Sequence, residues 1–331
     1  MDMERFHQGG PGAVWIGVDI GGTKTAVVLS FDPPAIAARV EFATLPDQGP
    51  SRALDRIIKT TRELLNAPDT QGIPLQAIGI SCGSPLDRTS GVIQSPPNLS
   101  TWVDIPIVSI LQREFNVDCR LENDANAGAV AEYRFGAGQG TQHMIFLTMG
   151  TGMGAGIIAD GRLYRGASDQ AGEIGHVRLT QTGPVGYNKA GSVEGWASGG
   201  GMAQFAYQEV TSALRNGEES RLAAILNSTG SLTAKDIAVA AQHGDKLAQR
   251  IIHSTGLRLG EALAILVDIL NPERIVIGGL AMRLGESLLA PAREAMAHEA
   301  LLPASRICEV VPAALGETIG DVAAICVSMG L

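Results

Sequence analysis

One local pattern occurs twice in this sequence and strongly restricts what the chain can fold into. A short apolar segment, a glycine-rich turn and a second apolar segment lie at residues 13–31 and again at residues 143–160. Short apolar runs bounded by glycine are typical of buried β-strands, so each pair predicts a hairpin. Helical patterns and further strands follow each hairpin. The repetition therefore predicts a duplicated α/β fold, with two halves around a cleft.

The spacing of apolar residues predicts the strands and helices along the chain. The expected strands are 13–20, 25–31, 35–44, 77–82, 117–123, 143–149, 155–160, 275–278 and 306–311. The expected helices are 51–66, 105–115, 125–135, 200–215, 233–242, 245–270, 284–299 and 317–329. We expect a smaller α/β lobe formed by residues 13–122 with the C-terminal helix 312–331, and a larger α/β lobe formed by residues 123–311.

Composition favours a cytoplasmic protein. The 331 residues are 45% hydrophobic, enough for a sizeable core, yet no apolar run reaches the roughly 18 residues that a membrane span needs. The first residues, MDMERFHQGGPG, lack the apolar stretch of a signal peptide. The four cysteines are far apart in the sequence and are expected to be buried thiols in a reducing compartment. We therefore expect no membrane partner.

The charge balance argues against a nucleic-acid partner. The net charge is −9, and no basic cluster interrupts the acidic background. An anionic small molecule remains compatible with this charge, because backbone N–H groups can bind phosphate without basic side chains.

The two glycine turns are candidate phosphate sites. In DIGGTKT (Asp19–Thr25) and TMGTGMGAGI (Thr148–Ile157), successive backbone N–H groups can point at one oxyanion. Asp19, at the end of a strand, can hold a magnesium ion. An ordinary tight hairpin is the alternative for each turn. A strand rather than a helix follows each turn, which disfavours a Walker loop or a dinucleotide-binding enzyme.

Asn123 and Asp124 lie where a strand is expected to end and a helix to begin. Both are favoured N-cap residues, so a capping role is a strong alternative to catalysis. In the catalytic interpretation, Asp124 is a general base that orients an attacking hydroxyl. A helix N-terminus is expected to lower the pKa of Asp124, which phosphoryl transfer tolerates.

Six motifs together resemble one family. DIGGTKT, SPPNL (95–99), ENDANAG, GTGMGAG, AGEIGH (171–176) and IVIGGL (275–280) occur in the order seen in the ROK family of sugar kinases and sugar-responsive repressors. The resemblance extends from about Val14 to the C-terminus. It implies a duplicated actin-like, ribonuclease H-like ATPase fold of the hexokinase type. It also implies phosphorylation of a hexose at its 6-hydroxyl, with ATP and Mg²⁺ as cofactors, glucose as the first candidate sugar and a homodimer as the assembly.

The resemblance also assigns roles to individual residues. Asp124 is similar to the catalytic base. The implied sugar contacts are Asn98, Asn123, Asp124, Glu173, His176 and Glu194. The implied ATP-binding residues are Asp19, Gly21, Gly22, Thr23, Lys24, Gly150, Thr151, Gly152, Gly278 and Gly279, with Asp19 also near magnesium. Taken singly, Asn98 could simply form a turn and His176 could be a hydrogen-bonded core residue.

The sequence departs from the family at a zinc motif. The family commonly carries C-x-C-G-x-x-G-C-x-E, and here Val185, Tyr187 and Ser192 occupy the three cysteine positions. Because none of the three is a thiolate, we predict no structural zinc. As a hypothesis, Tyr187 fills part of the vacated space. The loop SCGSPLD (81–87) also differs, since Gly83 and Ser84 replace the Pro-Gly of the family.

Other functions remain open at this point. The chain could phosphorylate another hexose or an N-acetylhexosamine, and some relatives accept polyphosphate as the donor. A sugar-binding regulator without catalysis is a further alternative. The DNA-binding repressor branch is disfavoured, because only about a dozen residues precede the first expected strand and the chain is acidic.

Overall fold

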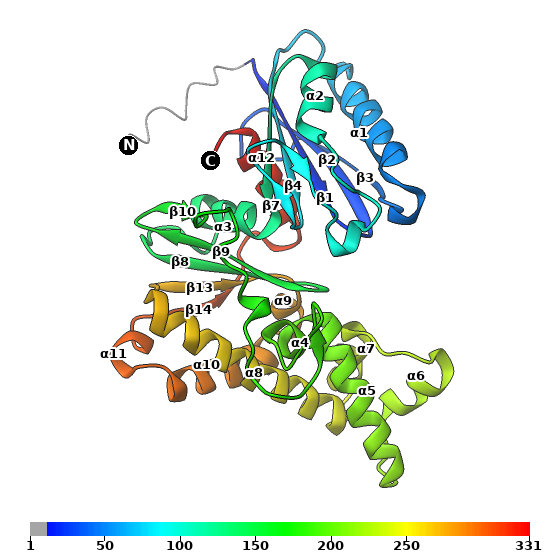
Figure 1. Ribbon diagram of the computed structural model, residues 1–331, viewed down its shortest axis with the longest axis vertical. Helices are drawn as coiled ribbons and strands as arrows, with labels where there is room; N and C mark the ends of the chain where they lie inside the picture. Colours follow the sequence, from blue (N-terminus) through cyan, green and yellow to red (C-terminus); the bar gives the residue numbers. More distant parts are fainter. Residues whose placement is uncertain (1–11) are drawn as a thin grey trace. The chain divides into compact units, whose positions relative to one another are not determined.

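The computed structural model describes residues 12–331, and the chain divides into two compact units (Figure 1). Unit 1 is Met1–Phe135 with Glu317–Leu331, and unit 2 is Gly136–Gly316. The expected absence of a signal peptide concerns residues that lie almost wholly outside the described range. The lobe boundaries expected from the sequence stay a prediction; they differ from this division in assigning residues 123–135 to the larger lobe and residues 312–316 to the smaller one.

In the described part of unit 1, from residue 12 onward, one main sheet is combined with four α-helices. Its strands are β1 (Val14–Ile20), β2 (Lys24–Ser30), β3 (Ala38–Ala43), β4 (Leu75–Cys82), β5 (Leu86–Asp87), β6 (Val92–Ile93) and β7 (Asp118–Asn123). Its helices are α1 (Pro50–Leu65), α2 (Ile107–Phe115), α3 (Asp124–Phe135) and α12 (Ile319–Ser328). The five-stranded sheet has the order β3-β2-β1-β4-β7. Strands β1, β4 and β7 are parallel to one another, β2 pairs antiparallel with β1, and β3 pairs antiparallel with β2 at the edge of the sheet.

Unit 2 repeats this sheet. Its strands are β8 (Met144–Met149), β9 (Met153–Ala159), β10 (Arg162–Tyr164), β11 (Val185–Gly186), β12 (Lys189–Ala190), β13 (Arg274–Ile277) and β14 (Glu309–Pro312). Its helices are α4 (Val193–Ala197), α5 (Gly199–Arg215), α6 (Arg221–Thr229), α7 (Ala234–Gln242), α8 (Lys246–Leu270), α9 (Leu280–Leu284), α10 (Glu286–Glu299) and α11 (Leu302–Ser305). The order β10-β9-β8-β13-β14 has the same sequence of antiparallel and parallel pairings as unit 1. The predicted duplicated α/β fold is confirmed.

In unit 1 the C-terminal helix α12 lies directly on the sheet, where Figure 1 draws it in red beside β4. Gly17 of β1 and Gly79 of β4 make this approach possible. A Cβ on Gly17 would lie 2.9 Å from the Cβ of Ala324, and a Cβ on Gly79 would lie 2.2 Å from the Ala324 carbonyl oxygen. Residues 321–328 of the helix are all buried. The N-terminal sheet thus takes part of its core from the far end of the chain.

In unit 2 glycines likewise let the long helix α8 pack closely against α10. A Cβ on Gly256 would lie 2.6 Å from the Pro291 side chain, and a Cβ on Gly260 would lie 2.4 Å from the Ala292 carbonyl oxygen. The two helices therefore pack with little between their backbones. No helix within residues 12–331 is both long enough and apolar enough to cross a membrane.

Two expected elements differ in extent from the structure, and helix α6 was not expected. The helix expected at 284–299 is broken by Gly285, whose φ of 53° cannot continue a helix, so α9 and α10 are separate. Helix α6 was not expected, because its first turn depends on a distant partner: the N–H of Arg221 donates to Asp245 Oδ2 at 2.6 Å. The strand expected at 306–311 begins only at Glu309, since Cys308 N–H still donates to the carbonyl of Ala304.

Candidate active site

The turn between β1 and β2 has the form expected of an anion-binding turn. Gly21 N–H donates to the Lys24 carbonyl oxygen at 3.0 Å and closes the turn. The N–H groups of Gly22 and Thr23 take no part in that bond, and the residues Thr23 and Lys24 are exposed. Consecutive backbone donors at a hairpin tip suit a phosphate oxygen.

Asn98 lies against this turn. It is exposed on the 3₁₀ helix Pro97–Leu99, and a Cβ on Gly22 would lie 2.6 Å from its own Cβ. Only glycine at position 22 lets the two segments meet. The structure therefore brings one predicted sugar-contact residue beside one predicted phosphate turn.

Asp19, in β1 just before the turn, is partly buried and close to other carboxylates. A Cβ on Gly320, in the first turn of α12, would lie 2.4 Å from Asp19 Oδ2, so the carboxylate is packed against that helix. Desolvation, together with the negative charges of Asp124 and Asp321, raises the pKa of Asp19 to about 7. The site thus concentrates negative charge, which a cation would relieve.

A chain of ion pairs borders this carboxylate. Arg39 Nε donates to Asp321 Oδ2 at 2.8 Å, and Arg39 Nη2 donates to Glu41 at 2.6 Å. Lys24 Nζ also contacts Glu41, at 3.0 Å. The Asp321 side chain is 5% exposed. Asp321 was missed in the sequence, although an acidic residue inside the otherwise apolar stretch IGDVAAICVS was a signal that could have revealed it.

Asn123 supports the local structure through both ends of its amide. Its Oδ1 accepts hydrogen bonds from the N–H groups of Ala125 and Asn126, at 2.9 and 3.1 Å, which is a capping contact at the start of α3. Its Nδ2 donates to Ser84 Oγ at 2.8 Å. The capping interpretation of Asn123 is confirmed, and its contact with a sugar stays a prediction. Ser84 is an additional residue of the site, in the loop that departs from the family.

Asp124 is the first residue of α3 and is exposed. Its Oδ1 accepts the N–H of Ala125 at 2.8 Å. The expectation that the helix start lowers the pKa of Asp124 is wrong. Neighbouring protein atoms displace part of the water around the carboxylate. This desolvation raises the pKa of Asp124 and outweighs the lowering by backbone hydrogen bonds. A carboxylate with a raised pKa is a better general base than a helix N-terminus alone would allow.

In unit 2 the turn between β8 and β9 is fastened to the start of α5. Gly150 N–H donates to the Gly152 carbonyl at 3.0 Å, while Gly199 and Gly200 donate to the carbonyls of Gly150 and Thr151 at 2.8 and 3.2 Å. These bonds use the carbonyl groups and leave out the N–H groups of Thr151 and Gly152. The second glycine turn therefore repeats the donor arrangement of the first.

Gly278 and Gly279 lie next to that second turn. Gly278 N–H donates to the Leu147 carbonyl at 2.9 Å, at the end of β8. Gly279 has a φ of 65°, and a Cβ there would lie 2.3 Å from the Met149 carbonyl oxygen. Pairing of β13 with β8 thus places both predicted nucleotide-binding segments of unit 2 together.

The other predicted sugar contacts surround a short 3₁₀ helix, Ile174–His176. Glu173 precedes this helix and His176 is its last residue, and both residues are exposed. Glu194, on α4, accepts the N–H of Met153 through Oε2 at 3.1 Å. A Cβ on Gly175 would lie 3.3 Å from the Glu194 Cβ. The structure therefore brings all three predicted residues to the region beside the β8–β9 turn.

The segment that replaces the family's zinc motif is held by hydrogen bonds. Gln204 binds the backbone of Val185 with both ends of its amide, at 3.0 and 2.9 Å. Ser192 Oγ accepts the N–H of Gly195 at 3.1 Å. The hypothesis that Tyr187 fills a vacated space is wrong: it is 59% exposed at the tip of a hairpin and meets the His176 ring edge-on at 6.1 Å.

The carboxylates of unit 1 suit magnesium better than a metal held by protein alone. No group of three or more His, Cys, Asp or Glu side chains within residues 12–331 could hold a metal ion. Mg²⁺ is usually held by one or two carboxylates together with substrate phosphates. Asp19, crowded by other negative charges near a glycine turn, fits that donor set.

Two sheets of identical strand order, each opening with a glycine-turn hairpin, define an α/β protein of the actin-like ATPase class. The profile of the ROK family matches residues 15–327, and the chain belongs to that family.

Three relatives illustrate the similarity. The chain is 33% identical to a glucokinase of Halalkalibacterium halodurans, over 92% of each chain. It is 31% identical to a xylose repressor of Caldicellulosiruptor bescii, over 84% of this chain and 69% of the repressor. A ROK family glucokinase from Streptomyces griseus, solved in complex with glucose and AMPPNP, is 30% identical with a TM-score of 0.78, over 96% of this chain and 100% of that one. The family contains kinases and regulators.

Proposed function

We propose that this protein is an ATP-dependent hexose kinase that phosphorylates the 6-hydroxyl of a glucose-like sugar. The observation that carries the proposal is the setting of Asp124: an accessible carboxylate at a helix start, with a raised pKa, in the same unit as Asp19 and a glycine turn. The similarity to two glucokinases over nearly the whole chain supports the same activity.

In the proposed mechanism Asp124 accepts the proton of the attacking hydroxyl. Its Oδ1 is held by the Ala125 N–H, which orients the carboxylate so that Oδ2 can bond the sugar hydroxyl. The base mainly positions the nucleophile, since the transition state of phosphoryl transfer is loose. The glycine turns donate N–H groups to the phosphates. Asp19 would hold magnesium, which neutralises charge on the polyphosphate.

Six polar residues are the proposed sugar contacts. They are Asn98, Asn123, Asp124, Glu173, His176 and Glu194. Carboxylate, amide and imidazole groups match the paired donors and acceptors of sugar hydroxyls. Gly278 and Gly279 are proposed to lie beneath the adenosine. A homodimer in the cytoplasm stays a prediction.

ADP release measured across a panel of hexoses and N-acetylhexosamines tests this function. With ATP and Mg²⁺ we expect turnover of at least one hexose, with glucose first in the panel, and polyphosphate as donor is a parallel arm. A sugar-binding regulator is the second candidate, favoured by the similarity to the xylose repressor. Calorimetric binding of a sugar without any ADP release would establish the regulator and overturn the kinase.

A further inference from the structure

Residues 177–193 form one closed loop between two of the proposed sugar contacts. His176 immediately precedes this 177–193 loop, and Glu194 immediately follows it. The loop is closed at its base by a hydrogen bond of 2.8 Å from Val193 N–H to the Val177 carbonyl. Whatever fixes the loop therefore also fixes how His176 and Glu194 lie relative to each other.

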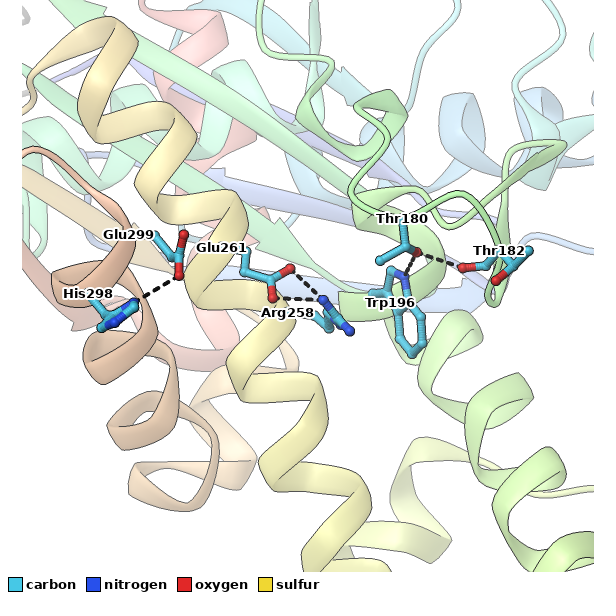
Figure 2. Close-up of polar contacts among 7 residues, drawn as sticks. All are labelled: Thr180, Thr182, Trp196, Arg258, Glu261, His298 and Glu299. Atoms are coloured by element: carbon cyan, nitrogen blue, oxygen red, sulfur yellow. Dashed lines mark hydrogen bonds and ion pairs between the residues drawn. The ribbon is translucent and has the colours of Figure 1, made fainter.

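The indole of Trp196 ties the loop from within α4. Its Nε1 donates to Thr180 Oγ1 at 2.7 Å, and Thr180 Oγ1 donates in turn to the Thr182 carbonyl at 2.7 Å (Figure 2). A Cβ on Gly183 would lie 2.6 Å from the indole ring, so the loop closes tightly over it. One hydroxyl thus links the beginning of the loop to the residue two positions after Glu194.

Trp196 is itself held from two other helices. The guanidinium of Arg258, on α8, lies 5.1 Å from the indole centroid. Arg258 Nη1 in turn contacts both carboxylate oxygens of Glu261, at 2.7 and 2.8 Å (Figure 2). The ring of Phe205, on α5, meets the indole edge-on at a centroid distance of 5.3 Å. An aromatic ring fixed on several sides is a rigid support for the hydrogen bond that it donates.

We propose that Thr180 and Trp196 are positioning residues for hexose recognition by His176 and Glu194. The inference rests on the proposed function and extends it to residues that would not touch the substrate. Their mutual hydrogen bond holds the 177–193 loop in one conformation, without a metal ion. Binding residues are effective only when their supporting contacts hold them in place.

Two variants remove the bond from opposite ends. Thr180→Val and Trp196→Phe should each raise the KM for the hexose about 5- to 10-fold, the effect of losing one net hydrogen bond. We expect kcat and the KM for ATP to change less than about twofold in both, because the bond lies in the sugar-binding segment. The KM of the double variant for the hexose should be no higher than that of the more affected single variant, since both changes remove the same bond.

Thr182→Val is the matched control, because Thr182 takes part through its backbone carbonyl and the substitution keeps that group. It should leave the hexose KM unchanged. Equal increases in the KM for the hexose and the KM for ATP would indicate general destabilisation and overturn the positioning role. Additive effects of the two substitutions on the hexose KM of the double variant would also overturn it.

Hexose binding by calorimetry, on the wild type and the same variants, separates the two proposals. Hexose binding without turnover overturns the kinase alone, and weaker binding in the two variants then still supports the positioning role. Binding that is equal in wild type and variants overturns the positioning role alone. A wild type that binds no hexose overturns both.

Discussion

Two opposing effects act on the pKa of Asp124: backbone hydrogen bonds lower it and desolvation raises it. The sequence indicates the first effect better than the second. A position at the helix start was foreseeable from the sequence, whereas the surroundings that limit hydration of the Asp124 carboxylate depend on the folded chain. The net pKa of Asp124 decides how well this residue can accept a proton. The catalytic hypothesis can therefore be tested by removing the carboxylate.

Asp124→Asn keeps the shape of the side chain and an oxygen that can accept the Ala125 N–H, but it removes the base. We expect kcat to fall by about 100-fold or more, the usual contribution of a general base, with hexose affinity largely kept. Steady-state kinetics with calorimetry measures both. Asp55→Asn, on exposed α1, is the control and should behave as wild type. Near-normal turnover in Asp124→Asn would remove Asp124 from the mechanism.

Asp19 should make the stability of the protein depend on pH. Its pKa rises from 3.8 to about 7 on folding, so the folded protein binds this proton more tightly than the unfolded chain. The resulting stability is fully present below about pH 4 and is lost as the pH rises through about 7. Asp19→Asn has no carboxylate at this position and escapes this loss. Between pH 4 and pH 8 its free energy of unfolding should rise by up to about 4 kcal/mol relative to that of the wild type. Urea unfolding in magnesium-free buffer tests it, and parallel pH profiles would contradict it.

At the scale of elements, glycines set how closely helices approach the sheets. Strand β4 meets α12 at Gly79, where an added Cβ would collide with the helix backbone. Such a position cannot be relieved by a side-chain rotation, because the obstructing atoms belong to the main chain. The packing of α12 therefore depends on the absence of a methyl group.

Gly79→Ala should lower the free energy of unfolding by about 1–3 kcal/mol, the usual cost of overpacking. Urea denaturation measures the change. Gly83→Ala is the matched control, since Gly83 has open space around its Cβ position within 4 Å. Equal stability of the Gly79 and Gly83 variants would show that α12 can shift without cost.

Much of this architecture was predictable. Strands β1, β2, β4, β7, β8, β9 and β13 and most helices were expected within a few residues, because their apolar periodicity is local information. Non-local contacts were not predictable. The bond of Arg221 to Asp245, the pair Arg39–Asp321 and the contact of Trp196 with Thr180 each join residues whose sequence neighbours give no sign of the partner.

The candidate site follows the same division. The glycine turns and the residues around Asp124 were identified from motifs, because each motif consists of residues that are adjacent in the sequence. Ser84 was noted only as a departure from a pattern, and its hydrogen bond to Asn123 required the fold. The pKa direction of Asp124 was predicted wrongly because desolvation is a property of the surroundings rather than of the helix start.

For the whole molecule we predict that folding needs no zinc. The three positions at which the family commonly has cysteines hold Val185, Tyr187 and Ser192, none of which provides a thiolate. Elemental analysis of the purified chain should find no stoichiometric zinc, and a chelator should leave the Tm unchanged. One tightly held zinc per chain would defeat this prediction.

The packing of α12 on β1 and β4 has a consequence for the order of events during synthesis. Unit 2 is one continuous stretch, so it can acquire its complete core once residue 316 has left the ribosome. Unit 1 begins the chain but needs Glu317–Leu331 to cover its sheet. Chains lengthen at about 5–20 residues per second, and domains generally fold as units. The nascent first sheet must therefore wait uncovered while some 180 further residues are translated (Gly136–Gly316, 181 by count), and the half of the protein that is made first is finished last.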